Sequence, residues 1–448
     1  MPVRSFLLMT LLLASPPAAG AEVTLSPVIS PKVSALLQRP PSSLRLGLLV
    51  RDLSSGQILE ASRPDELFVP ASTMKLVSMA ARLTQGGPDE THRVDVTAPA
   101  QAVAAKSAVL SHLTLRGGGD PSFSVSGAYS LAALARQLAA RGVKEVGEVR
   151  LSGRLDSATW PALPLGTPVV SVRLSEEPGW NDTPDGYDQR VIRAFEGQLR
   201  AVGIQVKPGG TLGRRVGQAV SEGFGQVLEG AGTPGPALLD EAPVATVRSQ
   251  PLIALIRRTL KPSDNVWAEQ LAAALGTEGG REVATHAGML AGMRTFLTRA
   301  GVQAAPLKLN DASGLSSADR LTPRTLVTVL QRMYDLPFTG LKTPLSPSDA
   351  FAQRKNLFIE ALPRGGTGEA SVQARDLGGT LASRFVGSGL DVRAKTGTLP
   401  GVSSLAGYVR GKSGHVLAFA IMVDQAKGNT LDVRAFQDKL LALIARLH

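Results

Sequence analysis

The 448-residue chain contains no cysteine, which excludes disulfide scaffolds, thiolate zinc sites, cysteine nucleophiles and lipid attachment at a cysteine. It has only five histidines, and no two of them stand at the spacing of metal ligands. We therefore expect neither a metal nor another cofactor. Aromatic residues make up only 4% of the chain, so its hydrophobic cores must depend on Leu, Val and Ala.

Long hydrophobic runs are also absent, and one short run stands near the N-terminus. Arg4 precedes the apolar residues 6–14, which Ser-Pro-Pro and the small residues 18–21 follow. This pattern is typical of a secretory signal with cleavage after Ala21. A membrane anchor is the weaker alternative, because the run is far shorter than the ~20 residues that span a bilayer. The sequence therefore predicts a signal peptide at 1–21 and an exported protein of the periplasm or cell envelope.

The formal net charge of +11 first suggests a nucleic-acid partner. Lysine and arginine are spread along the whole chain, however, without a dense run or interleaved aromatics, so a basic globular protein without a nucleic-acid partner is favoured. The segment 432–447 forms one apolar helical stripe. We predict that this helix packs across the preceding sheet; the alternative is a peripheral contact with a membrane surface.

The order of predicted elements indicates one catalytic domain that is split by an insertion. A strand at 46–50 with a hairpin partner at 57–60 precedes a helix at 73–83, and three successive strands are predicted at 391–398, 403–409 and 416–423. Between them, short strands alternate with helices. We predict four parts: a signal peptide at 1–21, a catalytic domain at 22–90, an inserted domain at 91–245, and the rest of the catalytic domain at 246–448.

Three short motifs carry candidate chemistry. Ser72 and Lys75 stand three residues apart at a helix start, so they share one face, and a lysine whose pKa is lowered can activate a serine hydroxyl. Most pairs at this spacing are solvated surface. Ser263-Asp264-Asn265 precedes a helix, where a serine and an amide can shuttle a proton and bind a peptide. Taken alone, this motif is better explained as an ordinary helix N-cap.

The third motif is Lys395-Thr396-Gly397-Thr398 on a predicted strand. A lysine and two hydroxyls can hold a carboxylate, and Gly397 has no side chain, which would let a substrate backbone come close. The alternative is an exposed edge strand protected by a lysine. The presence of all three motifs together favours the catalytic interpretation of each. Each motif occurs once, the three follow in this order, and each lies in the predicted setting: a helix start, a loop before a helix, and a strand. Such a triplet is typical of penicillin-binding proteins and serine β-lactamases.

The chain resembles the D-alanyl-D-alanine carboxypeptidase/endopeptidase family, the class C low-molecular-mass penicillin-binding proteins. Five segments carry the resemblance: 68–76 around the first motif, Gly118-Gly119-Asp120-Pro121-Ser122, Asp311-Ala312-Ser313-Gly314-Leu315-Ser316, 378–385, and 393–403 around the third motif. The resemblance implies an α/β (α+β) transpeptidase fold like that of penicillin-binding proteins and serine β-lactamases. That fold has an antiparallel sheet flanked by helices and, in this family, an inserted α/β domain.

Two features separate this family from the serine β-lactamases. The interval between Lys75 and Ser263 is too long for a loop, as in the class C carboxypeptidases. The deacylating glutamate of class A β-lactamases is missing, since Pro306 stands at its position before Leu309-Asn310. The sequence also departs from the family at one segment. The family has a tryptophan-rich segment in the inserted region, and Gly179-Trp180-Asn181-Asp182 matches it only loosely.

The resemblance implies a serine hydrolase that cleaves the D-Ala-D-Ala bond of peptidoglycan stem peptides, with D-Ala cross-links as a further substrate. Ser72 is the expected nucleophile, Lys75 its base and Ser263 the proton relay. Asn265, Lys395, Thr396, Gly397 and Thr398 are the expected substrate-binding residues. β-Lactam antibiotics are the expected covalent inhibitors. Two alternatives stay open: a serine β-lactamase or esterase, and a non-catalytic wall-binding or β-lactam-sensing protein.

Overall fold

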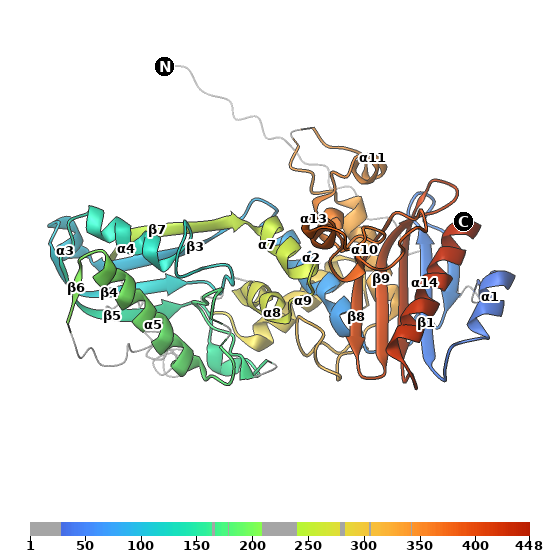
Figure 1. Cartoon of the computed structure of the whole chain (residues 1–448), viewed down its shortest axis with the longest axis horizontal. Helices are drawn as coiled ribbons and strands as arrows, with labels where there is room; N and C mark the ends of the chain where they lie inside the picture. Colours follow the sequence, from blue (N-terminus) through green and yellow to red (C-terminus); the bar gives the residue numbers. More distant parts are fainter. Residues whose placement is uncertain are drawn as a thin grey trace, which may run out of the picture.

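The computed structural model describes residues 28–163, 166–177, 179–207, 240–277, 283–303, 306–341 and 343–448. The signal peptide predicted at 1–21 lies outside these ranges. Among the described residues, every helix is too short or too polar to span a bilayer. The described chain forms two five-stranded sheets, which lie toward opposite ends of the molecule (Figure 1).

The first sheet is antiparallel and joins both ends of the chain. Its order is β2-β1-β10-β9-β8, and the strands are β1 (Arg45–Asp52), β2 (Ile58–Ser62), β8 (Val392–Leu399), β9 (Val402–Arg410) and β10 (Val416–Asp424). The central strand β10 is buried along its whole length, and its residues alternate between two cores. Such near-continuous apolar sequence is expected of a strand that is covered on both faces.

Helices cover both faces of this sheet. One face carries α1 (Pro31–Leu37) and α14 (Thr430–Leu447), whose apolar stripe packs on the strands, as predicted for the C-terminal helix. The other face carries most of the remaining helices: α2 (Met74–Gly86), α7 (Leu252–Leu260), α8 (Asn265–Ala272), α9 (His286–Arg299), α10 (Pro323–Asp335), α11 (Pro347–Ala352) and α12 (Leu357–Ala361). The short α13 (Val372–Gly378) and the 3-10 turns η1 (Ala71–Thr73) and η5 (Gly379–Leu381) lie near β8.

The second sheet is mixed and has its own core. Its order is β6-β5-β4-β3-β7, and its strands are β3 (Thr91–Pro99), β4 (Val109–Gly117), β5 (Glu145–Gly153), β6 (Gln205–Val206) and β7 (Glu241–Pro251). Its helices are α3 (Ala100–Ala104), α4 (Leu131–Ala140) and α5 (Pro184–Ala201). The pairs β4–β5 and β5–β6 are parallel, and α4 and α5 supply the crossovers that parallel neighbours require.

The predicted end of the inserted domain, residue 245, falls inside β7, which continues to Pro251 before α7 begins. The β3 and β7 strands pair antiparallel, so the chain enters and leaves the second sheet on adjacent strands. The division into domains itself stays a prediction.

Candidate active site

Ser72 lies in η1, at the point where the chain turns into α2. The preceding residue, Ala71, has a φ of 46°, and the Thr73 hydroxyl donates to the Pro70 carbonyl at 2.6 Å. A positive φ in a non-glycine residue is strained and marks a turn that the surrounding structure enforces. The turn leaves Ser72 half-buried in the wall of a cavity, while α2 continues behind it as a buried helix.

Lys75 lies one helical turn beyond Ser72 and is completely buried. Its Nζ lies 2.9 Å from Ser72 Oγ, 2.6 Å from Asn265 Oδ1 and 2.8 Å from the carbonyl oxygen of Ser313. Burial lowers the pKa of Lys75 to about 8, although the nearby Glu269 and Asp311 carboxylates oppose this shift. A tenth or so of the amine is therefore neutral at pH 7 and able to accept a proton.

Two buried carboxyl groups hold the segment that contacts Lys75. Glu269 of α8 accepts hydrogen bonds from the backbone N–H groups of Ala312 (3.0 Å) and Ser313 (2.8 Å). Asp311 accepts from those of Gly314 (2.6 Å) and Ser316 (2.7 Å). Burial, and then the charge of Asp311, raise the pKa of Glu269. Glu269 lies outside the three sequence motifs and had no predicted role. The available signal is its position four residues after Asn265, which places both side chains on one helix face.

Gly314 allows this segment to pass against the turn that carries Ser72. It has a φ of +77°, and a Cβ there would lie 1.8 Å from the Ala71 carbonyl oxygen. No side chain fits at this position, so the glycine is required by both its backbone conformation and its neighbour.

We expect the Gly314→Ala substitution to destabilise the protein by about 3 kcal/mol or more, since left-handed strain and overpacking each cost ~1–3 kcal/mol. Gly301→Ala is the matched control, because Gly301 has a φ of +84° with no atom near its Cβ position. The control should lose only ~1–2 kcal/mol. Denaturant unfolding measures both values, and equal losses would contradict the close contact at Ala71.

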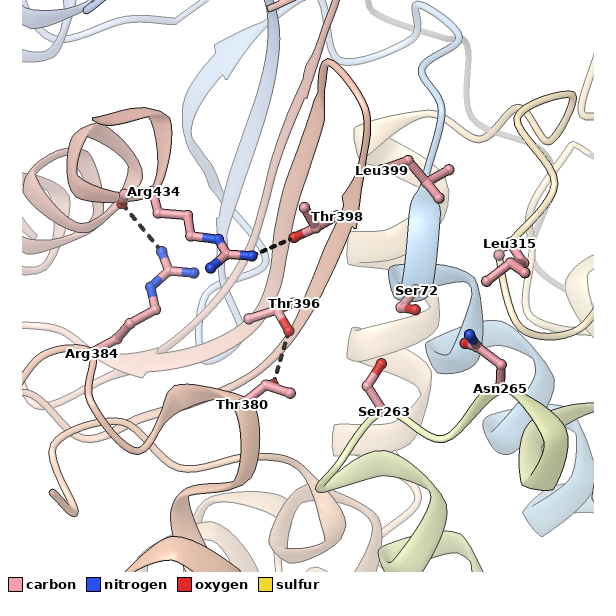
Figure 2. A pocket seen from close by; sticks show the side chains of 11 residues that line it. Ser72, Ser263, Asn265, Leu315, Thr380, Arg384, Thr396, Thr398, Leu399 and Arg434 are labelled. Atoms are coloured by element: carbon pink, nitrogen blue, oxygen red, sulfur yellow. Dashed lines mark hydrogen bonds between the residues drawn. The ribbon is translucent and has the colours of Figure 1, made fainter. Parts of the chain in front are cut away.

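The second motif combines a helix cap with two side chains that face the cavity. Asp264 is the N-cap of α8 and accepts from the Trp267 backbone N–H at 3.0 Å. Capping therefore occupies the middle residue of the motif, and Ser263 and Asn265 line the cavity. Ser263 has a φ of 67°, a further strained position beside Ser72. Figure 2 shows the side chains of Ser72, Ser263 and Asn265 turned toward one another.

The third motif lies on β8, an edge strand, and its residues alternate in direction. Thr396 and Thr398 line the cavity, whereas Lys395 is completely buried and donates to the Thr396 carbonyl at 2.8 Å. A lysine that protects an exposed edge would be solvated, so that alternative is wrong. Burial, followed by the charge of Lys75, lowers the pKa of Lys395 well below its usual value.

The structure gives a further reason for a glycine at position 397, while the predicted contact of Gly397 with a substrate backbone stays a prediction. A Cβ at this position would lie 2.6 Å from the Pro70 carbonyl oxygen and 3.0 Å from the Ser72 nitrogen. The glycine therefore makes room for the chain's own turn at Ser72. It brings the backbone of β8 against the backbone of η1.

The resulting cavity, called here the Ser72 cavity, has a volume of about 410 Å³. It is lined by Ser72, Ser263, Asn265, Gly314, Leu315, Thr380, Arg384, Thr396, Thr398, Leu399 and Arg434 (Figure 2). Lys75, Lys395 and Gly397 are packed behind this wall. Among the described residues, no three His, Asp or Glu side chains are grouped so that they could hold a metal ion.

Two arginines that sequence reasoning missed stand at the β8 side of the cavity. Arg434 of α14 donates to Thr398 Oγ1 at 3.0 Å, and Arg384 pairs with Asp438 at 2.5 Å and donates to the Arg434 carbonyl at 3.3 Å. The Thr396 hydroxyl donates to Thr380 Oγ1 at 2.8 Å. Guanidinium groups beside two threonine hydroxyls suit a carboxylate.

Comparison with known proteins gives three kinds of match. The model of the D-Ala-D-Ala carboxypeptidase 3 (S13) family matches residues 29–163 and 225–447. A D-alanyl-D-alanine carboxypeptidase of Actinomadura sp. (strain R39) is 30% identical, covering 92% of this chain and 84% of that protein. A carboxypeptidase DacB of Mycolicibacterium smegmatis is 28% identical, covering 92% and 85%.

Solved structures show the same fold. Penicillin binding protein 4 (dacB) from Haemophilus influenzae superposes with a TM-score of 0.67 at 18% identity, covering 93% of this chain and 100% of that chain. A predatory peptidoglycan endopeptidase from Bdellovibrio bacteriovorus superposes with a TM-score of 0.51 at 16% identity, covering 90% and 93%. The fold that the resemblance implies, an antiparallel sheet flanked by helices with a mixed α/β region inserted in the chain, is confirmed.

Proposed function

The chain belongs to the D-Ala-D-Ala carboxypeptidase 3 (S13) family, and on this basis we propose that it is a serine carboxypeptidase that removes the terminal D-alanine of peptidoglycan stem peptides through an acyl-enzyme on Ser72. The observation that carries the proposal is the 2.9 Å contact between the buried Lys75 amine and Ser72 Oγ. A nucleophile within hydrogen-bond reach of an oriented base is the arrangement that acyl transfer requires.

In the acylation step, the neutral Lys75 amine takes the proton of Ser72 as the serine oxygen attacks the carbonyl between the two D-alanines. Asn265 and the Ser313 carbonyl accept hydrogen bonds from the other Nζ protons, which holds the amine toward Ser72. The proposal places the oxyanion hole at the backbone N–H groups of Ser72 and Thr398, where such donors contribute ~3 kcal/mol each.

Ser263 is proposed to pass a proton to the leaving amine of the terminal D-alanine. Its position in the wall of the Ser72 cavity supports this role. Lys395 is proposed to set the electrostatics of the site: both lysine amines are buried, and after burial the charge of Lys75 contributes to the lowered pKa of Lys395. Asn265 binds the substrate backbone, and water then hydrolyses the ester to release the shortened peptide and restore Ser72.

The substrate's terminal carboxylate is proposed to bind between Thr396, Thr398 and Arg434. We expect Arg434→Gln to raise the KM for a pentapeptide with a free C-terminal carboxylate by roughly 10- to 100-fold, since a hydrogen bond to a charged group contributes ~1.5–3 kcal/mol. The same peptide with a C-terminal amide is the control, and its KM should stay unchanged. An equal loss for both peptides would assign Arg434 a purely structural role through Thr398.

The same site is proposed to act on D-Ala cross-links and to bind β-lactams covalently. Both peptide substrates present a D-Ala carbonyl to Ser72. The solved relative from Haemophilus influenzae is also known as a complex with a β-lactam, and the Bdellovibrio relative is named an endopeptidase. With Pro306 in place of the deacylating glutamate of class A β-lactamases, slow release of the acyl-enzyme is expected.

We also propose that the protein is exported to the periplasm or cell envelope, since residues 1–21 match a signal peptide and the substrate is wall peptidoglycan. The proposed inserted domain comprises the second sheet and its helices, with its end extended to the close of β7 at Pro251.

Release of D-alanine from a synthetic stem pentapeptide tests the proposed activity. We expect one D-alanine per peptide, and slow turnover of a chromogenic cephalosporin measured in parallel. Rapid cephalosporin turnover without D-alanine release would identify a β-lactamase instead. Stable acylation by penicillin without any peptide product would identify a β-lactam-sensing protein.

A further inference from the structure

A second cavity, called here the basic pocket, lies beside the active site and shares no lining residue with the Ser72 cavity. It has a volume of about 350 Å³ and is bounded by α7, α12, α13 and β8 and the loops next to them. Its lining residues are Arg257, Lys261, Arg354, Leu357, Glu360, Leu362, Arg364, Leu377 and Arg393. Five of the nine are cationic, and only Glu360 is acidic.

The one acidic side chain of the basic pocket is already engaged. Glu360 pairs with Arg393, whose two terminal nitrogens lie 2.5 Å from Glu360 Oε1 and 2.9 Å from Asp391 Oδ2. Arg393 is 2% exposed, and its Nε has no hydrogen-bond partner within the described part of the chain. The local carboxylates therefore neutralise Arg393, while the other three arginines of the pocket have no acidic partner among the described residues.

Three guanidinium groups remain without an acidic partner. Among the described residues, no ion pair or side-chain hydrogen bond joins Arg257, Arg354 or Arg364 to another group. Arg257 and Arg354 are exposed and Arg364 is half-buried, so they are accessible from solvent. Like charges gathered around one cavity repel one another unless an anion lies between them.

The same excess of positive charge acts on Lys261. Its Nζ donates to the carbonyl oxygens of Leu362 and of Leu377, the latter at 2.7 Å. Burial, and next the charge of Arg257, lower its pKa to about 7. Both carbonyl bonds remain possible for the charged amine, so a bound anion would favour that form.

We propose that the basic pocket binds a phosphate group, either free phosphate or the phosphate of a lipid headgroup. Arginine forks match phosphate oxygens bidentately, and a phosphate monoester carries ≈ −1.5 to −2 charges near pH 7, which suits several unpaired cations better than a monovalent carboxylate does. Since a water molecule occupies ~30 Å³, the volume also admits the group to which the phosphate is esterified.

The basic pocket is joined to the active site by short covalent and hydrogen-bonded paths. Lys261 stands two residues before Ser263, and its carbonyl oxygen accepts from the Thr380 backbone N–H at 3.1 Å. Thr380 in turn contacts Thr396 through their hydroxyls. The binding proposal does not depend on the proposed peptidase activity, and its test therefore measures binding alone.

Calorimetric titration of the full chain with inorganic phosphate, with acetate as a parallel ligand, tests the proposal. We expect one phosphate site, with acetate at least tenfold weaker. The double variant Arg354→Gln/Arg364→Gln should weaken phosphate binding by at least tenfold. Arg446→Gln, a change at an exposed residue of α14, and Arg434→Gln, a change in the Ser72 cavity, should leave it unaltered.

Thermal unfolding separates binding from damage to the fold. Without phosphate, the melting temperature of the double variant should equal or exceed that of the unchanged protein, because the repulsion between the pocket's cations is reduced. Added phosphate should raise the melting temperature of the unchanged protein but not that of the double variant. Vesicles that contain phosphatidic acid, whose headgroup is a phosphate monoester, distinguish the two sources. Binding of these vesicles that depends on Arg354 and Arg364, in place of binding of free phosphate, assigns a lipid headgroup. Absence of binding to phosphate and vesicles alike, equal binding by the double variant, or equal affinity for acetate would overturn the proposal.

Discussion

Replacing Ser72 with alanine is expected to abolish D-alanine release and penicillin acylation together, with turnover lowered by about 10⁴- to 10⁶-fold. The reason is that Ser72 supplies the oxygen that forms the acyl-enzyme, and no other group can take its place 2.9 Å from the Lys75 amine. Steady-state D-alanine release and labelling with a fluorescent penicillin measure the two losses.

The matched control for this variant is Ser317→Ala. Ser317 follows the segment that contacts Lys75, but its side chain is exposed and does not line the Ser72 cavity. We expect its activity and its melting temperature to remain within error of the unchanged protein. Residual turnover of Ser72→Ala above about one hundredth would contradict covalent catalysis by Ser72.

The pH dependence of acylation is expected to follow the titration of Lys75. Only the neutral amine accepts the serine proton, and burial lowers the pKa of Lys75 to about 8. The acylation rate should therefore rise about tenfold per pH unit below pH 8 and level off above it. Stopped-flow measurements with a chromogenic β-lactam between pH 5.5 and pH 10 give this profile.

Two variants show whether Lys75 is the group that titrates. Lys75→Met keeps the length of the side chain but offers no base, so we expect a rate lower by about 10²- to 10⁴-fold, without the step near pH 8. Glu269→Gln removes a nearby negative charge that opposes the lowering of the Lys75 pKa, so its step should move to lower pH. An unchanged profile in both variants would assign the step to another group.

Local sequence patterns predicted most of the structure around the site. The three C-terminal strands, expected at 391–398, 403–409 and 416–423, are β8, β9 and β10 within one residue at each end. The helices expected at 73–83 and 432–447 are α2 and α14, with bounds that differ by at most three residues. These segments have strong apolar periodicity and are bounded by clear caps or turns, so local and tertiary preferences agree.

Features that depend on tertiary contact were not predictable from the pattern. The reason for Gly397 lies in the approach of Pro70 and Ser72, more than 300 residues earlier in the chain. Arg434 stands on a helix whose amphipathic stripe was recognised, yet nothing local indicates that its guanidinium reaches Thr398. The basic pocket likewise gathers cations from positions 257 to 393, which lie far apart in the sequence and come together only in the fold.

The central claim, an acyl-enzyme on Ser72 formed with the help of Lys75, is tested most directly by locating the penicillin adduct. The protein is incubated with benzylpenicillin, digested, and analysed by mass spectrometry of the peptides. We expect one penicilloyl group per chain, on the peptide that contains Ser72, formed faster at pH 8 than at pH 6. An adduct on another residue, or no adduct in a protein that still releases D-alanine, would contradict it.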